Sequence, residues 1–347
     1  MRAVVLTARF LFSANYLKVC YNKPYKTKTE DIMDYSQILS QQFNIKEEYA
    51  KNIITLLDDG NTIPFIARYR KEMHGSMDDQ LIREFAEKLE YLRGLDKRRD
   101  EIRSLIDAQE KLNDEINLAL DKAATLSELE DIYRPYRPKR KTRASIAKEK
   151  GLEPFANDIL KQEKGFDPSK SSVDYIDEEK GVTSVEDAIQ GAMDIIAELV
   201  SDNAEIRKRI RNLTNANGVL VSVATDEEKD SVYKNYYDYK EPVKKIAGHR
   251  VLAVNRGEKE GFLKVSVETD SEKPLNSIFR AMITDKNQLC SDIIREACTD
   301  AYQRLIYPSI EREVRNDLTD VAAENAMKVF ACLLYTSDAA DEARSVD

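Results

Sequence analysis

The sequence predicts a mainly α-helical fold: a multi-helix array with a helix-turn-helix-like N-terminal region and a small β element near residues 218–268. Composition and pattern both indicate helices. Charged residues make up 34% of the 347 residues, tryptophan is absent, and there are only 11 glycines and 9 prolines, as is typical of long-helix proteins. Apolar residues recur at helical spacing in many segments. A chain of this length is expected to form two or three folded units.

The helix-turn-helix-like region is predicted from two short helices and a turn. Apolar residues recur at helical spacing from Lys46 to Leu57, and Asp58-Asp59-Gly60-Asn61 is a helix stop. Pro64 then stands where a first helical turn tolerates proline. The second helix carries three cations outside its apolar face: Arg68, Arg70 and Lys71. Such a pair most often packs in a core, and DNA binding by it is the less common alternative.

A long helix is predicted from Asp78, because an apolar stripe follows at helical spacing, formed by Leu81, Phe85, Leu89 and Leu92. Its polar face mixes charges of both signs, which usually indicates a solvated surface. A further helix is expected at about 114–124. The pattern Ser127-x-x-Glu130 then predicts a capping box for a short helix.

The most distinctive stretch is the Tyr-Arg-Pro segment, residues 133–143. Tyr133-Arg134-Pro135 is followed at once by Tyr136-Arg137-Pro138. A residue before proline disfavours the α region. We therefore expect polyproline II, with the tyrosines along one edge and the arginines along another. Four further cations follow directly: Lys139, Arg140, Lys141 and Arg143.

Three interpretations of the Tyr-Arg-Pro segment are open at this point. One is nucleic-acid binding, by stacking of the tyrosines and phosphate contacts of the cations. Another is an acidic protein surface, bound by forked arginine hydrogen bonds. The third is structural: the tyrosines pack on the helices on either side, and the cations pair with acids of the same chain.

Helices and a small β element are predicted for the rest of the chain. Residues 163–183 are polar and rich in turn formers, which predicts a surface loop. Ser184 is expected to cap a helix that continues through Val200, and the next helix begins at Asp202 and stops near Asn217-Gly218. Strands are expected at 218–224 and 262–268, and other helices at about 144–150, from 151, at 286–305 and at 309–331.

Aromatic and basic side chains gather a second time in residues 232–264, where four tyrosines lie near Arg250 and Arg256. A turn is predicted at Arg256–Gly261, before the second strand, whose buried face is expected to carry Leu263, Val265 and Val267. No other histidine, cysteine or carboxylate cluster lies near His249 in the sequence, which favours a structural role for this histidine.

Charge and cysteine usage narrow the class of protein. The net charge of −9 argues against nonspecific polyanion binding by the chain as a whole, so any nucleic-acid contact must be local. The four cysteines contain no C-x-x-C pair, which supports neither a zinc site nor a disulfide framework and fits a reducing, cytoplasmic setting. Cys290 and Cys298 are expected to be buried small hydrophobes. No apolar stretch approaches the ~20 residues of a membrane helix.

Catalytic patterns are not found. The sequence contains no Walker A or dinucleotide glycine pattern, no G-x-S-x-G and no H-E-x-x-H. Acidic pairs stand at helix ends, where capping explains them. We therefore expect no enzymatic activity, no cofactor and no metal. A metal-dependent nuclease is the weakest alternative, because it would need carboxylates that converge from separate elements.

Three stretches resemble the N-terminal half of Tex, a family of bacterial transcription accessory proteins: GNTIPFIARYRKE at 60–72, LEDIYRPYRPKRKTRASIAKEKGLEPFA at 129–156, and YYDYKEPVKKIAGHRVLAVNRGEKEGFLKV at 236–265. The resemblance covers roughly residues 33–330. It implies a helical, cytoplasmic nucleic-acid binder whose other domains are ribonuclease-H-like, helix-hairpin-helix and OB-fold. At position 134 the family often has an apolar residue, so a strict packing role for Arg134 is doubtful.

The resemblance also divides the chain. Residues 1–32 are expected to be a non-native leader, with Met33 as the natural initiator. Residues 33–225 are expected to form the Tex-like N-terminal helical region, and residues 226–330 a central helical region with the small β element. Residues 331–347 do not resemble the family and are expected to be a foreign tail. The C-terminal domains of the family would then be missing partners of this chain.

The sequence therefore predicts a transcription accessory fragment that binds RNA or DNA. The alternative is a protein-interaction scaffold that docks on RNA polymerase or the ribosome without touching nucleic acid. The candidate nucleic-acid contacts are Tyr133, Arg134, Tyr136, Arg137, Lys139, Arg140, Lys141, Arg143, Arg68, Arg70, Lys71, Arg250 and Arg256.

Overall fold

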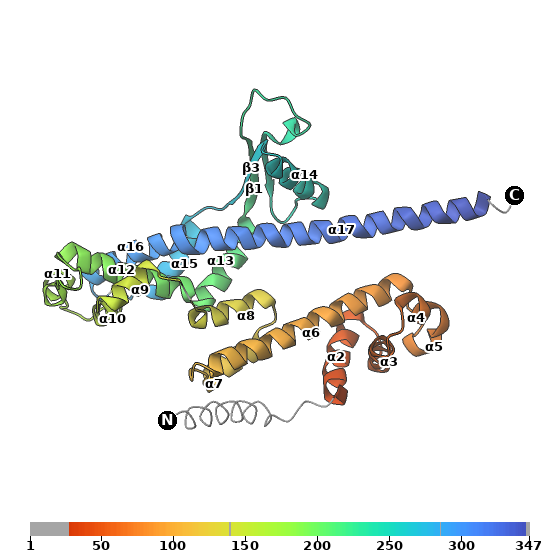
Figure 1. Cartoon of the computed structure of the whole chain (residues 1–347), viewed down its shortest axis with the longest axis horizontal. Helices are drawn as coiled ribbons and strands as arrows, with labels where there is room; N and C mark the ends of the chain where they lie inside the picture. Colours follow the sequence, from red (N-terminus) through yellow and green to blue (C-terminus); the bar gives the residue numbers. More distant parts are fainter. Residues whose placement is uncertain (1–27, 139, 285, 345–347) are drawn as a thin grey trace, which may run out of the picture. The chain divides into compact units, whose positions relative to one another are not determined.

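The structure, a computed structural model, describes residues 28–138, 140–284 and 286–344, with side chains between Tyr35 and Phe330. These described residues form two compact units, which divide between Glu110 and Lys111. Helices dominate both units, and the described β structure beyond an isolated bridge is one small antiparallel sheet (Figure 1). The predicted mainly α fold is confirmed. The predicted division of the chain at residue 225 stays a prediction, as do the non-native leader and tail.

The first unit is built on one long helix. Its elements are α2 (Lys28–Phe43), α3 (Glu47–Asp58), α4 (Ile63–Tyr69), α5 (Lys71–His74) and α6 (Asp79–Asp107). Asp78 caps α6 by accepting a hydrogen bond from the Leu81 backbone N–H at 2.7 Å. The predicted apolar stripe faces the core, with Phe85 and Leu89 buried and Leu81 and Leu92 partly buried.

The second unit is a helical body that carries the sheet. Before residue 218 it contains α7 (Asp114–Lys122), α8 (Leu126–Tyr133), η1 (Arg134–Tyr136), α9 (Arg143–Glu149), α10 (Glu153–Lys161), α11 (Pro168–Ser171), η2 (Ser172–Tyr175), α12 (Val185–Asp202) and α13 (Ala204–Asn217). After the sheet follow α15 (Glu272–Met282), α16 (Gln288–Asp300), the π-helical turn η4 (Ala301–Ile306) and the long α17 (Tyr307–Arg344).

The core of the second unit lies around α12. Ser184 caps this helix as predicted, accepting a hydrogen bond from the Asp187 backbone N–H at 3.1 Å. The buried face of α12 packs against α9, α10 and α16. Cys290 and Cys298 are buried in this core, as predicted, and burial raises the pKa of the Cys298 thiol to about 12. None of the helices in the described ranges is long and apolar enough to span a membrane.

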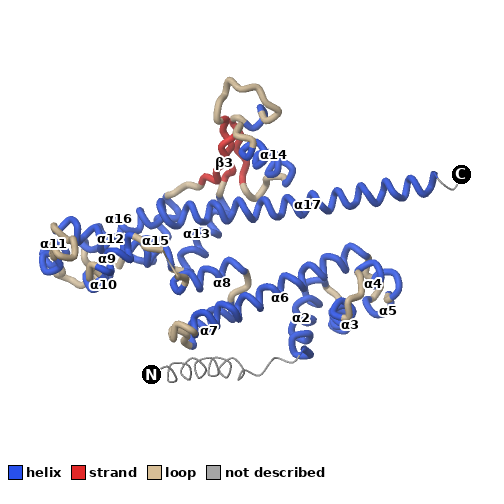
Figure 2. Tube along the Cα trace, in the orientation of Figure 1, coloured by secondary structure: helices blue, strands red, loops and turns tan. Residues whose placement is uncertain are grey.

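The sheet has the strand order β2-β1-β3, from β1 (Val219–Ala224), β2 (Asp238–Pro242) and β3 (Leu263–Glu268). Helix η3 (Lys234–Tyr236) precedes β2, and α14 (Gly248–Lys259) packs between β3 and α17 (Figure 2). The buried face of β3 carries Leu263, Val265 and Val267, as predicted.

Three local predictions are wrong. The predicted turn at Arg256–Gly261 is helical as far as Lys259, because Gly257 is buried where α14 approaches Leu263 and Tyr233. Arg134 has φ −52° and ψ −44°, so the first Tyr-Arg-Pro triplet continues α8 as a 3-10 turn, while Arg137, with φ −69° and ψ 132°, has polyproline II geometry. The cap of α8 is Thr125, whose hydroxyl accepts a hydrogen bond from the Glu128 backbone N–H, and not Ser127.

Gly257 gives a test of this packing. A Cβ at position 257 would lie 2.5 Å from Leu263 Cδ1 and 3.1 Å from Tyr233 Cγ. Gly257→Ala is therefore expected to lower the free energy of unfolding by about 1–2 kcal/mol, since overpacking outweighs the gain in helix propensity. Gly94→Ala in α6 is the control, because its Cβ meets nothing within 4 Å, and it should stabilise by about 0.5–1 kcal/mol. Urea unfolding measures both, and equal effects would contradict the packing argument.

Candidate nucleic-acid interface

The Tyr-Arg-Pro segment begins at the end of α8, and its first residues are engaged within the chain. Tyr133 is buried. Arg134 Nε lies 3.5 Å from Asp202 Oδ1 at the end of α12. Arg137 forms an ion pair with Glu130, and its guanidinium lies 5.6 Å from the centre of the Tyr133 ring. For these residues the arrangement corresponds to the structural interpretation of the segment.

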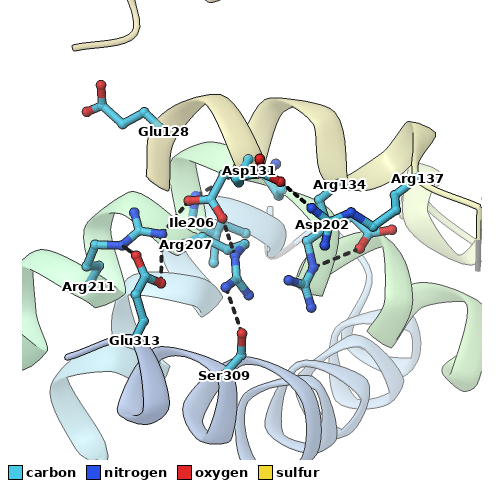
Figure 3. A network of polar contacts seen from close by, with 12 residues as sticks. Glu128, Asp131, Arg134, Arg137, Asp202, Ile206, Arg207, Arg211, Ser309 and Glu313 are labelled. Carbon is cyan, nitrogen blue, oxygen red and sulfur yellow. Dashed lines mark hydrogen bonds and ion pairs between the residues drawn. The ribbon is translucent and has the colours of Figure 1, made fainter. Parts of the chain in front are cut away.

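Beside these residues lies a buried ion-pair network that the sequence analysis did not predict (Figure 3). Asp131 accepts hydrogen bonds from Arg207 Nε and from Arg211 Nη2, each at 2.6 Å. Arg211 Nε also donates to Glu313 at 2.6 Å, and Arg207 Nη2 donates to Ser309 Oγ at 3.0 Å. The network therefore joins α8, α13 and α17.

The network is shielded from water, so each of its charges depends on an ion-pair partner within the chain. Arg207 is only 2% exposed and Asp131 only 5%. Burial lowers the pKa of the Arg211 guanidinium, but its hydrogen bonds to Glu313 and Asp131 outweigh burial and raise the pKa above its ordinary value. Burial and the nearby charge of Arg207 lower the pKa of Arg134. Arginine nevertheless stays protonated at neutral pH, so these side chains act as permanent cations.

A sequence signal for the network existed. Arg207 and Arg211 are one helical turn apart and lie on the buried side of α13 with Ile206, Ile210 and Thr214. Arginines within an apolar stripe indicate buried partners, because a solvated arginine belongs on the opposite face. The partner Asp131 stands 76 residues away from Arg207 in the chain, and spacing alone does not identify it.

The later cations of the segment are more exposed. Lys141 pairs with Glu149 at 3.1 Å, where both side chains are well solvated. Arg140 is exposed and forms no ion pair with any other described residue. Arg143 is exposed at the start of α9 and interacts electrostatically with Asp194. Burial raises the pKa of the Asp194 carboxyl, and the positive charges of Arg304 and Arg143 offset this rise only in part. Lys139 lies outside the described residues.

Of the two candidates near the sheet, Arg250 contacts strand β2. Arg250 Nη1 donates to Glu241 at 3.0 Å and to the Tyr239 hydroxyl at 3.2 Å. Tyr239 also donates to Glu241; this bond and the Arg250 contacts lower the pKa of Glu241, outweighing the opposing effect of burial. Tyr233 is buried, while Arg256 and His249 are exposed. In this cluster Tyr233 and Arg250 are therefore engaged within the chain, whereas Arg256 is exposed to solvent.

The third group of candidates forms an exposed surface on the first unit, the α4–α5 patch: Phe65, Arg68, Tyr69, Arg70 and Lys71. Residues 65, 68 and 69 are three or four apart on α4 and share one side of it. Tyr69 is 67% exposed, and its ring centre lies 5.3 Å from that of Phe65. The Arg70 guanidinium lies 5.7 Å from the Phe65 ring centre.

The α4–α5 patch is held in place from behind. Ile66 points the other way and is fully buried. The buried His74 of α5 donates from Nε2 to the Ile66 carbonyl oxygen at 3.1 Å, which links the two short helices. Within the described ranges, Arg68 and Lys71 have no ion pair, and Arg70 has only its contact with Phe65. The patch therefore presents aromatic faces and cations to solvent together.

The geometry can be compared with known proteins. Two family models match the chain, Tex-like protein N-terminal domain at residues 33–107 and Tex central region-like at residues 163–330. The chain belongs to the Tex family. This confirms the resemblance inferred from the three motifs. The two matched regions contain the α4–α5 patch and the arginines of the buried network.

Curated relatives agree with this assignment. The chain is 42% identical over 306 residues to the uncharacterized protein YdcI of Bacillus subtilis, covering 86% of this chain and 43% of that protein. It is 34% identical over 310 residues to the transcriptional accessory protein Tex of Neisseria gonorrhoeae, covering 86% and 40%. It is 30% identical over 323 residues to S1 RNA-binding domain-containing protein 1 of Homo sapiens, covering 88% and 32%. The Tex chain described here thus spans about two fifths or less of these relatives.

The buried network of this Tex chain generates a stability prediction. Asp131→Ala leaves Arg207 and Arg211 without their shared carboxylate, and it should lower the free energy of unfolding by about 3–5 kcal/mol. Lys208→Ala is the matched control, because it removes a solvated ion pair between the same two helices, Lys208 to Glu128 at 2.8 Å. Its expected cost is at most about 1 kcal/mol. Urea unfolding at pH 7 measures both, and a similar cost for the two variants would show that burial of the network is not important.

Proposed function

We propose that this chain is a nucleic-acid-binding part of a transcription accessory factor and that the α4–α5 patch is its principal contact. The relatives support the class: one is named a transcriptional accessory protein and another an S1 RNA-binding domain-containing protein. The observation that carries the proposal is the exposed Phe65–Tyr69 pair beside Arg68, Arg70 and Lys71. The proposed role is binding, without a catalytic step.

The chemistry of the patch suits single-stranded nucleic acid. Every base has a face that can stack on an aromatic ring, so exposed rings bind bases with little sequence preference. Neighbouring cations neutralise phosphates and release counterions, which gives affinity that depends on salt. The Phe65 and Tyr69 rings supply the first element, and the three cations beside them supply the second.

The Tyr-Arg-Pro segment is assigned a secondary part in this proposal. Arg134 and Arg137 are paired within the chain, and Tyr133 is buried, so binding by these residues would first require breaking internal contacts. The exposed Arg140, Lys141 and Arg143 remain available for auxiliary phosphate contacts. Arg250 is committed to Glu241, while Arg256 is exposed.

A protein-docking role is the second candidate, and the observation that favours it is on α17. Val321, Met327, Val329 and Phe330 are apolar and more than half exposed. Exposed apolar side chains gathered on one element are typical of interaction surfaces. RNA polymerase and the ribosome are the partners to test. Retention of either one by the tagged chain after nuclease treatment of the lysate would favour this role, whereas loss on nuclease treatment favours direct nucleic-acid binding.

The charge of the α4–α5 patch can be tested by salt titration of the full chain. The triple variant Arg68→Gln, Arg70→Gln, Lys71→Gln should flatten the log–log slope of affinity against salt by about 2 units on single-stranded RNA, since each lost phosphate contact contributes about 0.7 there. The pair Arg140→Gln, Lys141→Gln should change it by less. A wild-type chain that does not bind RNA or duplex DNA at low salt would contradict the proposed function.

The aromatic part of the patch has its own matched pair of variants. Tyr69→Ala should weaken binding to single-stranded RNA roughly 5- to 150-fold, the equivalent of about 1–3 kcal/mol for one stacked base. Tyr91→Ala is the control, since Tyr91 is also an exposed tyrosine of the first unit, 43% exposed and paired with Lys88. Fluorescence anisotropy with a labelled oligonucleotide measures both. Equal affinities for the two variants would show that Tyr69 does not stack on a base.

A further inference from the structure

A second basic surface lies in the second unit, in an open groove of about 450 Å³ between α13 and α15. These two helices pack against each other, and α13 also packs against α17 (Figure 1). The groove is lined by Arg209 and Leu213 of α13 and by Lys273, Asn276, Ser277 and Arg280 of α15. None of these residues was a candidate in the sequence analysis.

Helical geometry places the groove residues in two rows. On α15, positions 273, 276, 277 and 280 recur at helical spacing on one face, while Pro274 and Ile278 are buried on the other side. On α13, positions 209 and 213 are one turn apart, and the buried Ile206 and Ile210 anchor the helix behind them. The two rows face a common space because the core fixes both helices.

The three cations of the groove have no partner among the described residues. Arg209, Lys273 and Arg280 are exposed and form no ion pair or side-chain hydrogen bond there. The neighbouring cations Lys208 and Arg211 are already paired with Glu128 and Glu313. Among nearby acids, Glu205 interacts with Lys208, and Glu272 does not face Lys273, because adjacent helix positions point apart. The groove therefore has three uncompensated positive charges.

We propose that this groove binds the phosphodiester backbone of a nucleic-acid strand. Lys273 and Arg280 are seven residues apart on α15, about 10 Å along the helix axis. At that separation the two side chains can contact different phosphates of one strand. Asn276 and Ser277 lie between the two cations and can donate hydrogen bonds to phosphate oxygens or sugar hydroxyls.

A phosphate backbone fits the groove better than an acidic protein segment does. Of the lining residues in the described chain, only Leu213 has an apolar side chain, and none is aromatic. Most of the exposed lining is apolar, but it includes no aromatic anchor of the kind from which protein interfaces obtain much of their affinity. The inference rests on the proposed function, since it assigns a second contact for the same class of ligand.

The test uses the full chain with three variants that each lose three charges. The groove variant is Arg209→Gln, Lys273→Gln, Arg280→Gln. The control variant is Lys164→Gln, Lys229→Gln, Lys286→Gln, which removes three exposed lysines outside the groove. The third is the α4–α5 triple variant. Circular dichroism first checks that all of them are folded. Binding to a labelled single-stranded RNA is then measured by anisotropy between low and physiological salt.

The groove variant is expected to bind RNA at least tenfold more weakly than the wild type at low salt. It should also flatten the log–log slope of affinity against salt by about 2 units. The control variant should change the slope by less than half as much. Equal effects of the groove and control variants would overturn the proposal while leaving the proposed function intact. The proposal would also be overturned if the chain bound polyglutamate more tightly than RNA and the groove variant lost that binding. The occupant of the groove would then be an acidic protein segment.

A second ligand separates failure of the groove from failure of the proposed function. Inorganic tripolyphosphate should raise the melting temperature of the wild-type chain and of the α4–α5 triple variant, but not that of the groove variant. If RNA does not bind the wild type and this pattern is still found, the groove binds free polyphosphate, and the nucleic-acid assignment is wrong. If tripolyphosphate stabilises the groove variant as much as the wild type, the groove is not a phosphate site.

Discussion

The arrangement of the second unit depends on one carboxylate, Asp131, which is shared by the buried guanidinium groups of Arg207 and Arg211. A buried ion pair is not in itself a strong source of stability, because removing charges from water costs nearly as much as their attraction returns. The ion pair instead fixes how the helices pack, because any packing that separates the two charges leaves one of them buried without a partner. Through Ser309 and Glu313 the same constraint reaches α17, so the end of α8 is fixed against two helices that lie far away in the sequence.

This constraint explains why the most conspicuous basic motif is not the most available one. Arg134 and Arg137 lie next to the network and meet Asp202 and Glu130. Arg250 likewise meets Glu241 within the small sheet. In a chain with a net charge of −9, the informative cations are those that have no acidic partner and gather on one surface. Two such groups lie on α4–α5 in the first unit and in the α13–α15 groove in the second.

The sequence predicted what depends on local pattern. The apolar stripe of α6, the Ser184 cap and the alternation in β3 all follow from spacing within one element, and all are found. The errors occur where tertiary contacts override local preference. Arg134 is helical before a proline because the burial of Tyr133 and the position of Asp202 hold it there. Gly257 resembles a turn residue but is needed for close packing inside a helix. The candidate site was predicted only in part. The cations of the α4–α5 patch were expected from the sequence. The groove was not, because it combines residues of α13 and α15, and no local sequence pattern relates residue 209 to residue 280.

The two available basic surfaces differ in chemistry, and this difference suggests different tasks. The α4–α5 patch combines rings with cations and suits unpaired bases, whereas the groove has cations and hydrogen-bond donors without rings and suits a backbone. Each surface alone offers only a few phosphate contacts, and a few contacts give weak binding at physiological salt. Where one strand engages two weak surfaces of the same chain, its affinity exceeds that for either surface alone, because the second contact is intramolecular. A chain with negative net charge can therefore bind a polyanion without a large basic face, provided that its uncompensated cations are gathered at a small number of places.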